Sequence, residues 1–202
     1  VVLTAVVLSA CRVDVAADLY SEDLLEVDKN IAFPAIMEIE ITSCSASDRK
    51  STEREILSIF SSQADAKIFG CREDGFTSLL GVSFEGEIAS DKSSYDLVIF
   101  RNENENGNRY FTATLGTDFK TRMNSLLDDN MQSLDYNNLT LSINLKHDLD
   151  EPARYFLITG WVDGTSGQYV SGNVEKRDNV NIKFSNLMSD MILKDMQPIL
   201  FF

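Results

Sequence analysis

Cationic residues are scarce in this chain of 202 residues, and they are never clustered. Eighteen Lys and Arg stand against 32 Asp and Glu, for a formal net charge of −14, and no more than two cations are adjacent. Nucleic-acid binding requires clustered cations that neutralise phosphates. Attachment to anionic lipid headgroups by charge requires such clusters too. The composition therefore predicts no nucleic-acid partner, and it predicts that charge does not hold this protein on a membrane.

Catalytic and ligand-binding motifs are also lacking. The chain has no GxSxG, HExxH or glycine-rich phosphate loop, and its single histidine is His147. Metal sites usually need three or four converging ligands. We therefore expect no catalytic residue, no metal, no cofactor and no enzymatic activity, with His147 in a solvated turn between two strands.

Two chemical alternatives stay open. A hydrolase would have to be built on His147, although no serine lies in a nucleophile elbow. Calcium would need hard oxygen ligands, but the EF-hand spacing with its glycine is absent, so the acidic residues are expected to be solvated. Two sets of carboxylates are considered for calcium, either Asp148, Asp150 and Glu151, or Asp128 and Asp129.

The uncharged run at residues 1–10 is too short to cross a bilayer, which takes roughly 20 apolar residues. It has the length of the apolar core of a secretory signal, about 7–15 residues. The run closes on Leu8-Ser9-Ala10-Cys11, which resembles a bacterial lipoprotein signal. This predicts a signal peptide over residues 1–10, trimmed at its start, and a mature N-terminal Cys11 whose acyl chains anchor the protein in membrane lipid. The alternative is a buried N-terminal strand that ends in cysteine.

Cysteine is rare, with three residues in all. Once Cys11 carries lipid, Cys44 and Cys71 remain as an even pair in an oxidising compartment, which predicts a disulfide. Closing a loop of 27 residues stabilises a fold by about 3–4 kcal/mol in the chain-entropy estimate. The alternative is two buried free thiols.

Apolar and polar residues alternate along most of the chain, which is typical of half-buried strands. The pattern predicts an α+β fold, with a predominantly antiparallel sheet of about seven to nine strands and two or three packed helices, as a single domain over residues 11–202. Strands are expected over residues 13–19, 35–42, 66–71, 80–88, 95–101, 109–115, 139–145, 154–162, 168–175 and 180–184. Helices are expected from a capping box at Thr52–Glu55, from Thr117, and over residues 187–196 with Met188, Met191 and Met196 inward.

The opening of the expected mature chain carries a resemblance. Cys11-Arg12-Val13-Asp14-Val15, continuing to Leu19-Tyr20 and Asp23, is similar to uncharacterised lipoproteins of bacteriophages and prophages of Gram-negative bacteria, and the similarity extends through Cys44 and the following helix. That family has no established activity, so only the lipidation of Cys11 carries over. A weaker likeness, limited to Cys-x-Val-x-Val, exists to mycobacterial lipoproteins. The sorting rule of enteric bacteria, applied to Arg12, implies the outer membrane.

Together these patterns predict a lipoprotein anchored to the bacterial outer membrane and facing the periplasm. The expected strand begins two residues after Cys11 without a flexible linker, so partners are expected near the membrane face. The expected function is that of a binding module for another envelope protein, and the resemblance implies phage exclusion or receptor blocking. The alternative is a carrier of a lipid or other apolar ligand in a pocket between the sheet and the helices.

Overall fold

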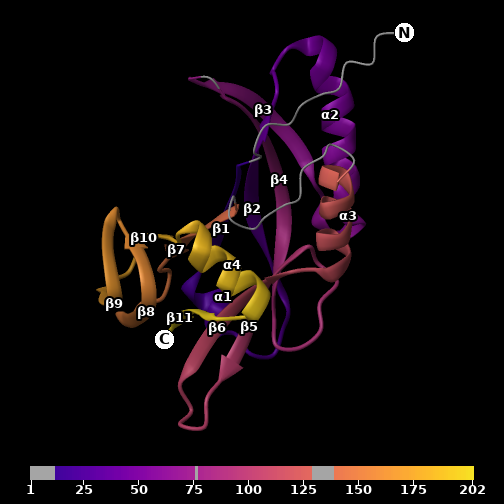
Figure 1. Cartoon of the computed structure of the whole chain (residues 1–202). Helices are drawn as coiled ribbons and strands as arrows, with labels where there is room; N and C mark the ends of the chain where they lie inside the picture. Colours follow the sequence, from indigo (N-terminus) through magenta and orange to yellow (C-terminus); the bar gives the residue numbers. More distant parts are fainter. Residues whose placement is uncertain (1–11, 76, 129–138) are drawn as a thin grey trace.

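The structure is a computed structural model that describes residues 12–75, 77–128 and 139–202. The described part holds eleven strands that belong to one sheet, with four α-helices around it (Figure 1). The strands are β1 (Val13–Tyr20), β2 (Ile31–Ile41), β3 (Lys67–Asp74), β4 (Thr77–Ala89), β5 (Leu97–Glu103), β6 (Arg109–Leu115), β7 (Leu139–Lys146), β8 (Ala153–Val162), β9 (Thr165–Val174), β10 (Asn179–Lys183) and β11 (Pro198–Phe201). The helices are α1 (Ser21–Leu25), α2 (Ala46–Ile59), α3 (Thr117–Asp128) and α4 (Asn186–Asp195), with a 3₁₀ turn at Ser62–Ala64.

The sheet closes on itself. The strand order is β10-β7-β1-β2-β4-β5-β6-β11-β8, and β8 pairs back with β10, which makes a closed barrel of nine strands. β3 and β9 lie outside this ring, paired with β4 and β8 respectively. Most neighbours are antiparallel, as expected, but β1 pairs with β7 and β4 pairs with β5 in parallel. The sequence predicted about seven to nine strands and two or three helices, and the described residues hold eleven strands and four α-helices. Closure into a barrel was not predicted, because strand alternation says nothing about which remote edges meet.

The core lies on the inner side of the curved sheet. Inward residues of β1 and β7 alternate strictly with outward ones, and the inward set is 2% exposed or less. The ring of Phe60, which follows α2, packs at a tilt against Phe84 of β4 and Phe119 of α3, with ring centroids 5.1 and 5.2 Å apart. α4 contacts both β6 and β7, which lie on opposite sides of the ring. α4 therefore lies across the ring, whereas α2 and α3 pack together beside β3 and β4, and burial of their apolar residues stabilises the sheet.

Helix ends and faces depart from the sequence pattern in three places. α2 begins at Ala46, so Thr52–Glu55 is inside the helix and forms no capping box. Met191 and Met196 were expected to face inward, yet 37% and 42% of their surface is exposed, and only Met188 is half-buried. The helix ends at Asp195 and the chain then enters β11, a strand that the pattern did not predict.

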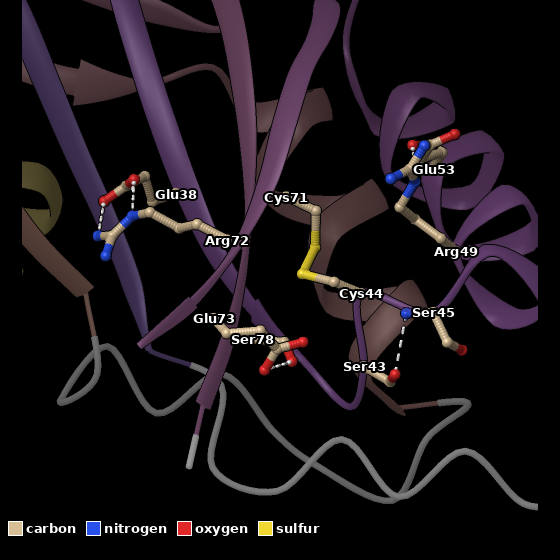
Figure 2. Close-up of a disulfide and its surroundings, with 10 residues drawn as sticks. All are labelled: Glu38, Ser43, Cys44, Ser45, Arg49, Glu53, Cys71, Arg72, Glu73 and Ser78. Atoms are coloured by element: carbon tan, nitrogen blue, oxygen red, sulfur yellow. Dashed lines mark hydrogen bonds and ion pairs between the residues drawn. A yellow bond between two sulfur atoms is a disulfide. The ribbon is translucent and has the colours of Figure 1, made fainter. Parts of the chain in front are cut away.

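Cys44 and Cys71 form a disulfide, as predicted, with their Cα atoms 5.7 Å apart. Figure 2 shows that the bond joins the loop entering α2 to β3. On the outer face beside it, Arg72 donates from Nε and Nη2 to the two carboxylate oxygens of Glu38 on β2, at 3.0 and 2.9 Å. The edge strand β3 is thus fixed to the α2 loop and, through a side-chain pair, to a strand two positions away.

Candidate functional site

The predicted lipidation residue Cys11 and the predicted signal over residues 1–10 lie outside the described residues. Backbone hydrogen bonds hold the chain that follows them. The Arg12 carbonyl accepts a hydrogen bond from the Glu40 N–H at 2.9 Å, and Val13 pairs with Ile39 of β2 and with Leu139 of β7. Only Arg12 therefore separates Cys11 from a strand that is held on both edges.

A groove of about 550 Å³ opens beside this start of β1. It lies next to the seam where β8 meets β10, and that seam consists of two residue pairs, Ile182 with Val162 and Lys183 with Trp161. Residues from distant parts of the chain line it, chiefly Arg12, Asp14, Thr140, Trp161, Lys183 and Phe184. The groove therefore forms only because β8 and β10 meet to close the barrel, and Arg12, the residue after Cys11, is part of its wall.

Local features of the chain position the groove residues. A Cβ at Gly160 would lie 3.3 Å from the Lys183 carbonyl oxygen, so glycine at this position lets β8 approach β10 closely. The Phe184 N–H donates to the Leu141 carbonyl at 2.9 Å, which fixes the exit from β10. Ser185 then caps α4, because its hydroxyl accepts from the Met188 N–H at 3.2 Å.

The groove combines an aromatic wall with a charged rim. Trp161 is 38% exposed and Phe184 is almost fully buried, so the indole is the aromatic surface that a ligand would meet. On the β1 side, Arg12 pairs with Asp14 at 2.7 Å, and the Thr140 hydroxyl donates to the same carboxylate. Lys183 is exposed and forms no ion pair with any residue that the structure describes. An aromatic centre inside a polar rim is the usual anatomy of a protein-binding surface.

A second cleft, of about 380 Å³, surrounds Asp96 at the start of β5. The Asp96 carboxylate, 3% exposed, accepts from the Ser61 N–H at 2.6 Å and from Arg122 at 3.0 Å. Arg122 also donates to the Ile59 carbonyl at 2.6 Å. Burial raises the pKa of Asp96 above its usual range, although the bonds from Ser61 and the Arg122 charge act against it. The group ties the end of α2, β5 and α3 together, and we interpret it as structural.

His147 is buried, 1% exposed, and the expected solvated turn is wrong for this residue. Its Nδ1 lies 2.9 Å from the Ser21 hydroxyl and its Nε2 lies 2.8 Å from the Glu151 carbonyl. Since a carbonyl only accepts, Nε2 carries the proton and Ser21 donates to Nδ1. Both side chains are enclosed, so no substrate reaches the serine hydroxyl, and the pair joins α1 to the β7–β8 loop.

Two of the carboxylates considered for calcium have partners other than a metal site. Asp148 accepts from the Glu22 N–H at 3.0 Å, and Asp150 pairs with Lys176. Within residues 12–75, 77–128 and 139–202, no group of three or more His, Cys, Asp and Glu has the arrangement of a metal site. Asp129 lies outside the described residues.

Trp161, Lys183 and Phe184 were not singled out by sequence, because each stands in a strand pattern that explains it fully. The only signal was that Trp161 is the single tryptophan of the chain. No helix in the described part of the chain is both long enough and apolar enough to cross a membrane.

Comparison with known proteins places the chain in a family but not in a function. No curated protein matches it. One family, described as a domain of unknown function, DUF7424, matches residues 13–201, from the first residue of β1 to the last residue of β11. The chain belongs to this family.

Proposed function

We propose that this protein is an acylated binding module of a bacterial envelope, held in the outer membrane through Cys11. The observation that carries the proposal is the groove beside the start of β1. Arg12 lines it and directly follows Cys11, and one residue of extended chain spans at most about 3.6 Å. An anchor at Cys11 would therefore hold the groove at the membrane face.

The partner that suits this groove is another envelope protein. Trp161 offers an exposed aromatic surface, and tryptophan and arginine are the residues most often found at binding hot spots. Arg12 already pairs with Asp14, so Lys183 is the rim cation that favours a partner segment in which a carboxylate flanks an apolar side chain. A lipid carrier would instead need an enclosed apolar chamber, and this groove opens to solvent, so the carrier remains an untested alternative.

The anchor is tested first. The chain is expressed in Gram-negative cells behind an initiator Met and a basic segment, with a palmitate analogue in the medium. We expect the wild type to be labelled and to sediment with membranes, and Cys11→Ser to be unlabelled. A wild-type product that stays unlabelled and washes free in buffer contradicts the anchor.

The groove is tested with a photoreactive amino acid in place of Lys183, and with the same residue in place of Asn106 as the control. Asn106 lies in the exposed turn between β5 and β6. We expect an adduct of one defined mass from the groove position, lost when Trp161→Ala or Cys11→Ser is added. Identical adducts from both positions, or adducts that Trp161→Ala leaves unchanged, contradict a binding role for the groove.

The resemblance to phage lipoproteins adds a more specific proposal, that the bound partner is a phage receptor or an entry component. Cells that express the wild type are then expected to give fewer plaques than cells that express Cys11→Ser or Trp161→Ala. Equal plaque counts on all three strains contradict phage exclusion while leaving the anchor and the groove to their own tests.

A further inference from the structure

β9 is an edge strand whose outer side is unpaired. It pairs with β8 and with no other described strand, and the opposite edge of β8 is taken by β11 and β10. In Figure 1 the β8–β9 hairpin stands at the side of the molecule away from α2 and α3. The register with β8 is the same on both sides of Tyr169, with Val170 opposite Leu157 and Gln168 opposite Thr159. The strand therefore presents unpaired backbone donors and acceptors on both sides of Tyr169, whose left-handed backbone (φ 60°) interrupts the row at one residue.

This edge carries none of the charges that usually protect an exposed strand. A quarter of the whole chain is charged, so ten residues would be expected to hold two or three charges, yet β9 (TSGQYVSGNV) has none. Proteins commonly blunt free edges with Lys, Pro or inward charges to prevent pairing with another chain. β9 lacks these devices, in a molecule whose net charge of −14 repels its own copies elsewhere.

An aromatic row on the outer face leads to the same edge. Tyr110 of β6, Phe201 of β11, Phe156 of β8 and Tyr169 of β9 follow one another, with ring centroids 5.7, 5.8 and 6.1 Å apart. Tyr169 is the last of them and is 65% exposed. A strand added beside β9 would cover this ring, and a second copy would bring an identical row to meet it.

We propose that two copies of this chain pair through β9, antiparallel about a two-fold axis. Such an interface is self-complementary, so the turn before β9 in one copy meets the turn after β9 in the other. Asp163 lies in the first turn and Arg177 in the second. Both are exposed, and neither forms an ion pair with a residue in the described ranges. The Asp163 carboxylate accepts a hydrogen bond from the Asn181 N–H at 3.0 Å. The turn after β9 also holds Glu175, Lys176 and Asp178, but Lys176 already pairs with Asp150, so Arg177 is the cation that the pairing offers to Asp163 of the other copy.

The paired surface is small, because a single strand pair buries less than the 1,200–2,000 Å² or so of a stable complex. The dimer is therefore weak in solution and strengthens where the chain is concentrated, as on a membrane. This inference does not depend on the groove or on its partner. A strand from another protein is the other occupant of such an edge, and the experiment separates the two.

The test measures the mass of the whole chain by sedimentation equilibrium in a density-matched detergent, over a concentration series. The variant Gln168→Lys with Ser171→Lys places like charges close to the axis, where directly opposed like charges destabilise pairing. It also brings the net charge from −14 to −14 + 2 = −12, so general repulsion falls and only a local effect can weaken the dimer. The control, Asn106→Lys with Asn108→Lys, makes the same charge change in the β5–β6 turn.

We expect the wild type and the control to rise from 22.6 kDa toward twice that mass as concentration increases. The β9 variant is expected to need at least about tenfold higher concentration for the same dimer fraction. Any association through residues 1–11 is common to all three chains. A wild type that stays monomeric, which would leave the edge to a strand of another protein, overturns the proposal. Equal association of all three chains overturns it too. Circular dichroism of the β9 variant shows whether its fold is intact. An unfolded variant is replaced by Arg177→Glu, compared with Asn106→Asp and Asn108→Asp together as its control, because both chains then carry −14 − 2 = −16 and only Arg177→Glu is expected to weaken the dimer.

Discussion

β3 and β9 both lie outside the ring and pair with one neighbour each, yet they are built in opposite ways. Half of the eight residues of β3 are charged, namely Lys67, Arg72, Glu73 and Asp74. Its pairing with β4 shifts register between Ile68 and Gly70, and the disulfide holds it to the loop before α2. β9 is longer, uncharged and held by β8 alone.

The difference shows which edge is protected. Charged side chains and an irregular register oppose pairing with another chain, and so does a disulfide that holds a loop beside the edge. β3 has all three features. β9 has one local irregularity, the left-handed backbone of Tyr169 at φ 60°, and its register with β8 is the same on both sides of that residue. The molecule therefore has one closed edge and one open edge, and the predictions below change either of them.

The largest effect is expected from removing the disulfide. Cys44→Ser with Cys71→Ser releases a loop of 27 residues, so the free energy of unfolding should fall by about 3–4 kcal/mol. Urea unfolding measures the loss, and hydrogen exchange locates it, with faster exchange in β3 and unchanged exchange in β9. The reduced wild type is the control and should match the double variant. An unchanged urea midpoint would show that the bond does not hold the β3 edge.

The positions of most strands and the disulfide could be predicted from local sequence patterns. Alternation located most strands because a half-buried strand repeats every two residues, and β1 and β7 keep that repeat without exception. The disulfide followed from the predicted compartment and the number of cysteines. The register between remote strands could not be predicted from these patterns. The β8–β10 seam that closes the ring consists of only two residue pairs, and the residues of each pair are about 20 positions apart in the sequence.

The errors have a common physical cause, which is tertiary contact overriding a local signal. Residues before Thr52 are polar and show no helical repeat, yet they form the first turns of α2, next to the disulfide. His147 stands between Lys146 and Asp148, and this charged sequence predicted a solvated turn. In the structure the Ser21 hydroxyl and the Glu151 carbonyl bind the two ring nitrogens of His147. The groove was equally invisible, because its residues run from Arg12 to Asn186 and meet only after closure.

The next largest effect is expected where a glycine lets an edge strand pack closely on its neighbour, at Gly172 between β9 and β8 and at Gly81 between β4 and β3. A Cβ at Gly172 of β9 would lie 2.6 Å from the Tyr155 hydroxyl, and Tyr155 is 6% exposed. A Cβ at Gly81 of β4 would meet the Phe69 ring of β3, which is 57% exposed. Tyr155 has no space to move into, whereas Phe69 is free to turn toward solvent. Gly172→Ala should therefore lower the free energy of unfolding by about 1–3 kcal/mol.

The matched variant Gly81→Ala should change stability by less than about 1 kcal/mol, because the loss of glycine freedom in the unfolded chain offsets the displacement of Phe69. Chemical denaturation of the two variants side by side measures the difference. Equal losses would mean that the β3 edge is as tightly packed as the β9 edge, and the contrast between closed and open edges would then rest on charge alone.

The smallest effect concerns the one irregularity of β9. Tyr169 stacks on Phe156, at 6.1 Å between ring centroids, and holds a left-handed backbone that costs a non-glycine residue about 1–2 kcal/mol. Tyr169→Ala loses the stacking, worth about 0.5–1.5 kcal/mol, and keeps the strain. Tyr169→Gly loses the stacking and the strain together. The glycine variant should therefore be about 1 kcal/mol more stable than the alanine variant, as measured by thermal unfolding. If the alanine variant is as stable as the glycine variant or more stable, residue 169 has no left-handed strain and its backbone is extended. The edge of β9 would then be regular over its whole length and more accessible to a second strand.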